Sequence, residues 1–120
     1  MARVAVLVPD LLFGSKVLSM LGEAGHEVTV CPPGAQAPAA AAGAEVLVVD
    51  LTTEQVDGAA LLESMRRAPG GSPRTLAFYR HTDVATQRRA RDAGFDVVVP
   101  RSRMAREGPQ LVAALVGAPS

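Results

Sequence analysis

The sequence is poor in aromatic residues: one tyrosine, three phenylalanines and no tryptophan make up 3% of its 120 residues. The core must therefore be built mainly from aliphatic side chains, which favours an α/β layer structure over a β-sandwich. The same scarcity argues against a nucleic-acid platform, because such platforms stack bases on aromatic rings.

Cysteine and long hydrophobic runs are also scarce. Cys31 is the only cysteine, which excludes an internal disulfide and any zinc site with several cysteines. No run approaches the ~20 apolar residues that span a bilayer. The apolar run at the N-terminus stops at Pro9, too early for a secretion signal. These features predict a soluble cytoplasmic protein.

A length of 120 residues suits one domain with a single core, so we expect one domain over residues 1–120. The formal net charge is zero, but the charges are segregated along the chain. Residues 1–65 contain two basic and eight acidic residues, whereas residues 66–106 contain ten arginines and three aspartates. Glu107 is the remaining acidic residue and brings the formal net charge to zero. The molecule is polarised if the fold keeps these two parts separate.

The most informative stretch is Glu45–Leu51, which reads E-V-L-V-V-D-L. Four apolar residues followed by a carboxylate are typical of a strand buried on both faces, whose last residue emerges at the carboxyl edge of a sheet. Open α/β sheets bind ligands outside this edge, so Asp50 is a candidate site residue. The residues that close the neighbouring strands are candidates with it: Asp10, Tyr79, His81 and Arg101.

Similar apolar runs alternate with helix-like segments along the chain. The predicted strands are Arg3–Val8, Glu27–Cys31, the stretch ending at Asp50, Thr75–Phe78 and Val97–Val99. Helices are predicted between them, with stops at Gly25 and Gly94, and a last short helix is predicted to begin at Pro109. This alternation implies a single doubly wound α/β domain, with a five-stranded parallel sheet and helices on both faces. The alanine-rich segment Ala35–Ala44 is predicted to be a connector without function.

The order and spacing of several residues resemble the receiver domains of bacterial response regulators. The matching residues are Asp50, Asp57-Gly58, Leu61-Leu62, Ala93-Gly94 and Arg101. The resemblance covers the whole chain and implies the flavodoxin-like, CheY-like fold with strand order 2-1-3-4-5. It also implies a role in two-component signalling, through contacts with other signalling proteins.

In that family, the aspartate of the third strand accepts phosphate and two acids after the first strand help to hold Mg²⁺. A Thr or Ser ends the fourth strand, and a Lys ends the fifth. If the chain is active in this way, the resemblance makes Asp50 the phosphoacceptor and makes Asp10 and Asp50 ligands of Mg²⁺. The cation is needed because it offsets the charge of the transferring phosphoryl group.

The chain departs from this pattern at several positions. Asp10 stands alone where an acidic pair is expected, the hydroxyl position falls on Phe78 or Tyr79, and Arg101 replaces the lysine. We therefore interpret the chain as a degenerate, stand-alone pseudo-receiver that acts by protein–protein interaction without the standard phosphorylation cycle. The alternative is a functional single-domain response regulator phosphorylated on Asp50.

Two residues near the predicted site have open roles. Arg101 can pair with Asp50 and hold the domain in one conformation, or it can contact phosphate. His81 can be a base or a ligand. No second histidine or cysteine at metal-ligand spacing accompanies it, which favours an ordinary surface loop residue.

Arginines on the predicted fourth helix and after the fifth strand form a candidate partner face: Arg88, Arg89, Arg91, Arg103 and Arg106. In receivers this region is the usual output and dimer face, so the resemblance implies an acidic partner or a homodimer. The alternative is a solvated charged surface. Nucleic acid is disfavoured, because the chain has neither net positive charge nor rings for stacking.

This topology also hosts flavins and nucleotides, so a small-molecule site is a further alternative. Neither G-x-G-x-x-G nor a P-loop follows any predicted strand, which argues against it. No supported pair of nucleophile and base is recognisable, and we do not expect an enzyme.

Overall fold

The computed structural model describes residues 2–31, 43–67 and 73–117. The strands are β1 (Arg3–Leu7), β2 (Glu27–Val30), β3 (Val46–Asp50), β4 (Arg74–Tyr79) and β5 (Val97–Pro100). The helices are α1 (Leu11–Glu23), α3 (Gly58–Arg67), α4 (Val84–Ala93) and α5 (Arg101–Val116). Most of the alanine-rich connector lies outside the described residues. Every helix in the described ranges is too short or too polar to span a lipid bilayer.

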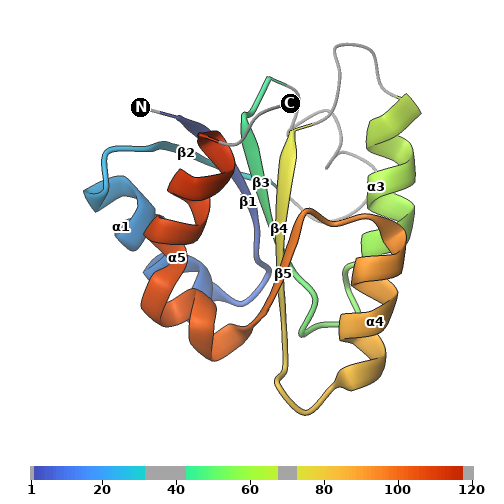
Figure 1. Cartoon of the computed structure of the whole chain (residues 1–120). Helices are drawn as coiled ribbons and strands as arrows, with labels where there is room; N and C mark the ends of the chain where they lie inside the picture. Colours follow the sequence, from blue (N-terminus) through green and yellow to red (C-terminus); the bar gives the residue numbers. More distant parts are fainter. Residues whose placement is uncertain (1, 32–42, 68–72, 118–120) are drawn as a thin grey trace.

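The five strands form one parallel sheet in the order β2-β1-β3-β4-β5, which confirms the predicted topology. Helices α1 and α5 cover one face of the sheet, and α3 and α4 cover the other (Figure 1). Because the strands are parallel, their carboxyl ends meet at one edge, the lower edge of the sheet in Figure 1. Asp50, the last residue of β3, lies beside Phe78 of β4 at this edge.

Alternation along the strands divides the core into two layers. Val48 and Phe78 pack with the side chains of α1 and α5, whereas Leu47 and Val49 pack with those of α3 and α4. The three buried residues of α3 are Leu61, Leu62 and Met65. Residues Val46–Asp50 are all buried, as expected for a strand covered on both faces.

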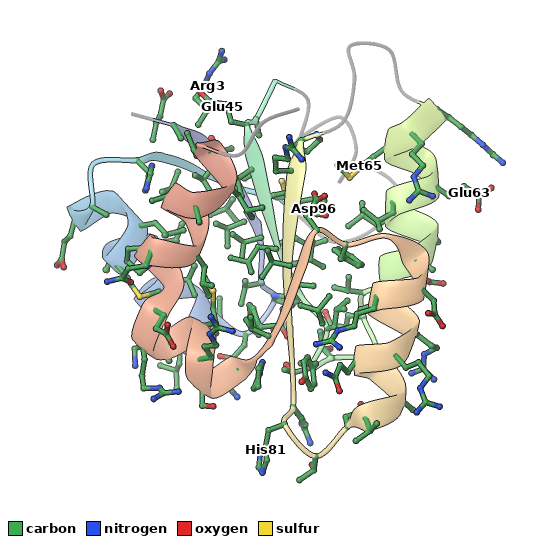
Figure 2. All side chains as sticks on the ribbon, in the orientation of Figure 1. Arg3, Glu45, Glu63, Met65, His81 and Asp96 are labelled. Atoms are coloured by element: carbon green, nitrogen blue, oxygen red, sulfur yellow. The ribbon has the colours of Figure 1, made fainter. Side chains whose placement is uncertain are left out.

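Polar contacts fix the two ends of α4 and its connection to β5. Asp83 is the N-cap, and its Oδ1 accepts a hydrogen bond from the Thr86 amide at 3.1 Å. Gly94 ends the helix with a φ of 107°, a left-handed conformation that suits glycine, so the predicted stop is confirmed. Asp96, labelled in Figure 2, then accepts hydrogen bonds from the amide and hydroxyl of buried Thr75 at 2.8 and 3.1 Å. This contact ties β4 to the start of β5.

The prediction that the last helix begins at Pro109 is wrong. Helix α5 begins at Arg101, directly after β5, and Pro109 lies inside it. Its buried residues are Met104, Gly108, Val112 and Leu115. Their spacing of three and four residues is that of one helical face, and burial of this face against the sheet outweighs the helix-breaking tendency of proline.

Candidate functional site

A cleft of about 1180 Å³ opens at the carboxyl edge of the sheet. It lies among the loops that follow β1, β3 and β4 and the first residues of α3, α4 and α5. Its charged lining residues are Asp10, Asp50, Glu54, Asp57, Asp83, Arg80, Arg89 and Arg101. The cleft therefore lies where ligands bind in open α/β sheets, and its lining mixes acids with arginines.

Asp50 lies in this lining but is only 1% exposed. Its Oδ1 accepts two hydrogen bonds from Thr52, from the amide at 2.7 Å and from the hydroxyl at 2.6 Å. Thr52 is the second residue after the strand, so the chain turns back on the carboxylate as soon as β3 ends. A buried carboxylate needs such donors, and here a neighbouring threonine supplies them.

Asp10 and Arg101 lie next to each other in the lining of the cleft. The Oδ1 of Asp10 caps α1 by accepting hydrogen bonds from the amides of Leu12 and Phe13 at 2.9 and 3.0 Å. Its Oδ2 lies 3.6 Å from a guanidinium nitrogen of Arg101. The Arg101 guanidinium also lies over the Phe13 ring, 4.3 Å from its centroid. Arg101 is thus paired with Asp10, and not with Asp50 as one of the predictions had it.

A second polar group in the cleft comes from the start of α4 and was not predicted from the sequence. The Thr86 hydroxyl donates to Asp83 Oδ2 at 2.6 Å and accepts from an Arg89 guanidinium nitrogen at 3.1 Å. The hydroxyl hydrogen bond, followed by the amide hydrogen bond of Thr86, lowers the pKa of the Asp83 carboxyl, and Arg89 and Arg80 lower it further. The spacing of three residues from Asp83 to Thr86 to Arg89 was the signal in the sequence, because it places all three on one side of a helix.

Solved structures with the same architecture are receiver domains. A signal receiver domain of a response regulator from Bermanella marisrubri is 19% identical, with a TM-score of 0.84 over 96% of this chain and 98% of that one. The receiver domain of a sensor histidine kinase from Pseudomonas aeruginosa, with magnesium coordinated in its active-site cleft, is 16% identical, with a TM-score of 0.84 over 98% of each chain. The receiver domain of a Francisella response regulator is 19% identical, with a TM-score of 0.74 over 97% of each chain.

The chain has the receiver-domain fold. Neither a protein-family model nor a curated protein matches the sequence itself. At identities of 16–19% the similarity establishes the arrangement of strands and helices, and the chemistry of the cleft has to be argued from this chain's own residues.

Three residues predicted to lie in the pocket of the receiver fold do not line the cleft. Phe78 is fully buried in the layer beneath α1 and α5, where its ring packs against Phe13 with 5.1 Å between centroids. Tyr79, which ends β4, is 5% exposed and is also absent from the lining. Figure 2 shows His81 at the outer end of the loop between β4 and α4, pointing away from the domain. The strand pleat turns Phe78 into the core. The side chain of His81 points away from the cleft that Arg80 and Asp83 of the same loop line.

The five arginines of the predicted partner face do not all share one surface. Arg89 lines the cleft. Residues two apart on a helix point to different sides, so Arg91 faces away from Arg89. Arg103 pairs with Glu107 at 3.3 Å on α5, which lies on the other face of the sheet. Arg88, Arg91, Arg103 and Arg106 are exposed, and their role in partner binding stays a prediction.

The acids of the cleft do not fit a magnesium site of the receiver type. Mg²⁺ requires several oxygen ligands in near-octahedral geometry. The described residues contain no group of three or more His, Cys, Asp or Glu side chains that could hold a metal ion. Of the two predicted ligands, Asp10 contacts the α1 amides with one oxygen and Arg101 with the other.

Proposed function

We propose that this chain is a receiver-like signalling domain that acts by binding other proteins, without the Mg²⁺-dependent phosphorylation cycle. The observation that carries the proposal is the pairing of Asp10 with Arg101 at 3.6 Å. Phosphoryl transfer to a carboxylate needs a divalent cation to offset the charge of the transferring group. In this cleft an arginine of the chain faces the carboxylate that would have to help hold that cation.

The end of β4 supports the same proposal. A receiver that switches on phosphorylation needs a hydroxyl there to contact the new phosphate. This chain has Phe78 and Tyr79 instead, and both are buried outside the lining of the cleft. The Thr86 hydroxyl does line the cleft, but it is occupied by Asp83 and Arg89. A phosphoryl group on Asp50 would therefore lack the hydroxyl that contacts it in a receiver that switches on phosphorylation.

The proposed partners are signalling proteins that contact the exposed arginines beside β5. Helices α4 and α5 contact this edge strand from opposite faces of the sheet, and Arg91 and Arg106 are exposed residues of these two helices. Positive charge at such an edge attracts an acidic surface and speeds encounter with it. A homodimer through the same region is included in the proposal.

The experiment is intact-mass spectrometry after incubation with acetyl phosphate and Mg²⁺, with beryllofluoride as a second probe. We expect no phosphoryl adduct on the wild-type chain under conditions that label a standard receiver domain. An adduct that is lost in Asp50→Asn would overturn the proposal in favour of a functional response regulator phosphorylated on Asp50. The matched control is Asp57→Asn, which removes another acid of the same cleft and must leave any such adduct in place.

A further inference from the structure

Asp10, Phe13 and Arg101 form a small cluster, which we call the Arg101 clamp, and Asp10 and Arg101 belong to the lining of the cleft. Asp10 and Phe13 belong to the start of α1, and Arg101 is the first residue of α5. The guanidinium has a carboxylate oxygen 3.6 Å from one nitrogen and a ring centroid 4.3 Å from its central carbon. The ring is itself fixed, because it packs edge-on against buried Phe78. The clamp therefore joins the first turns of two helices that follow different strands.

We propose that Arg101 is a built-in counter-ion of the cleft and that it keeps divalent cations from binding between Asp10 and Asp50. A cation approaching Asp10 needs an oxygen that is free to coordinate it. Oδ1 is held by the amides of Leu12 and Phe13, which leaves Oδ2, and Oδ2 faces the guanidinium. Like charges at such short range repel, and a planar guanidinium cannot lose its proton to relieve the repulsion.

The other carboxylate cannot compensate for the loss of Asp10. Asp50 is buried, and its Oδ1 already accepts two hydrogen bonds from Thr52. A lone carboxylate oxygen, together with water, is a weak site for Mg²⁺. The inference deepens the proposed function, because it gives a physical reason why the cleft lacks the cation step.

The contacts of the Arg101 clamp can be removed by substitution without unfolding the domain. Both Asp10 and Arg101 have side chains that are 45% exposed, so their ion pair is a surface interaction of modest strength. The hydrophobic layer beneath it is built from other residues, among them Val17, Leu21 and Met104. We therefore expect Arg101→Ala to fold, and Arg101→Gln offers the same loss of charge with less loss of side-chain volume.

The experiment is calorimetric titration with MgCl₂, repeated with MnCl₂, at constant ionic strength. We expect weak binding to the wild-type chain and binding to Arg101→Ala that is at least about tenfold tighter, because removal of the neighbouring positive charge frees Asp10. Arg103→Ala is the matched control: it removes the same charge two residues along α5, from an arginine that pairs with Glu107 outside the cleft. It should bind the ions as the wild-type chain does.

Two double variants test the ligands. Arg101→Ala combined with Asp10→Asn or with Asp50→Asn should lose the gained affinity, and asparagine at residue 10 retains the helix cap. The proposal is overturned if Arg101→Ala binds no more tightly than the wild-type chain, if Arg103→Ala gains equally, or if the gain survives in either double variant. Circular dichroism establishes that each variant is folded, and Arg101→Gln takes the place of Arg101→Ala if the latter is not.

The titration and the phosphorylation assay can fail separately. If the wild-type chain forms no adduct but Arg101→Ala gains no affinity for Mg²⁺, the counter-ion inference is wrong and the proposed function stands. If the wild-type chain is phosphorylated on Asp50, the proposed function is wrong whatever the titration gives.

Discussion

Asp83 is the residue whose ionisation the fold changes most clearly among the cleft acids. Hydrogen bonds from the Thr86 hydroxyl and amide lower the pKa of its carboxyl below the ordinary value of 3.8. A lowered pKa means that the charged form is favoured by folding. Its contribution to stability is therefore complete above pH 3.8 and is lost as the pH falls through the lower pKa of the folded state.

We expect Thr86→Val to raise the pKa of Asp83 towards 3.8 and to shift acid unfolding to higher pH. The valine removes the hydroxyl hydrogen bond, which is the largest cause of the shift, and keeps the amide hydrogen bond, so the return should be partial. Titration of the carboxyl carbon by NMR measures the pKa directly. Thr82→Val, an exposed threonine in the same loop, is the control, and equal pKa values of Asp83 in both variants would contradict the assignment.

Residues at strand ends could be predicted from the sequence, and their partners could not. The apolar run before Asp50 fixed its place at the edge of the sheet, and Asp10 followed from the same argument. The partner of Arg101 depends on how α5 leaves β5, which no local pattern specifies, and it proved to be Asp10. That Arg89 lines the cleft was not predicted, because the rotation of α4 about its axis is set by packing of Ala90 against the core.

At the scale of elements, α5 is the helix whose stability is most open to change. Pro109 lies in its interior, where it has no N–H to donate to the carbonyl of Ala105 and its ring crowds that carbonyl. An interior proline costs a helix about 3 kcal/mol relative to alanine. Part of this cost is offset because proline also restricts the unfolded chain, by roughly 0.4–1 kcal/mol.

We therefore expect Pro109→Ala to stabilise the domain by about 2–2.6 kcal/mol. Chemical denaturation followed by circular dichroism measures the free energy of unfolding. Gln110→Ala, at the exposed neighbouring position, is the control and should change stability little, because glutamine and alanine both favour helix. A Pro109→Ala variant of unchanged or lower stability would contradict the assignment of a net cost to the proline at this position.

The strands were predictable because each is a short apolar run bounded by polar or turn residues. Their order in the sheet came from the resemblance, and the structure confirms it. The start of α5 was missed because Gly108 and Pro109 interrupt what is otherwise a continuous helical face from Met104 to Leu115. The local preference of proline for the first turn of a helix predicted that the helix begins at Pro109. Burial of the helical face against the sheet outweighed that preference, so the helix begins earlier.

At the scale of the whole molecule, the strand order places the strands of the acidic segment and those of the basic segment on different sides of the sheet, and the two segments meet in the cleft, where Asp10 pairs with Arg101. Residues 1–65 supply β1, β2, β3, α1 and most of α3, and they carry eight of the acidic side chains. Residues 66–106 supply β4, β5, α4 and the first turns of α5, and they carry ten arginines. The first set of strands is contiguous on one side of the sheet, and the second lies on the other. None of the segments outside the described residues carries a charged side chain.

A molecule with zero net charge and separated charges should attract its own copies at low salt. The domain measures 34 × 33 × 28 Å. The screening length of salt solution is about 30 Å at 0.01 M and about 8 Å at 0.15 M, so the opposed charges of two copies interact fully only at the lower concentration.

Static light scattering over a protein concentration series at pH 7 measures this attraction as the second virial coefficient. We expect the coefficient to be negative at low salt and to rise towards zero as NaCl is added, because screening weakens the contact of acidic and basic sides. Arg88→Glu combined with Arg91→Glu gives the molecule a net negative charge and should make the coefficient positive at low salt. Replacement of Glu27 and Glu45 by glutamine leaves the arginines in place while giving a net positive charge, and it should also abolish the attraction. A coefficient of the wild-type chain that does not depend on salt would mean that the two charged sides do not meet, and a homodimer through the arginines beside β5 would then have to form by packing of apolar side chains.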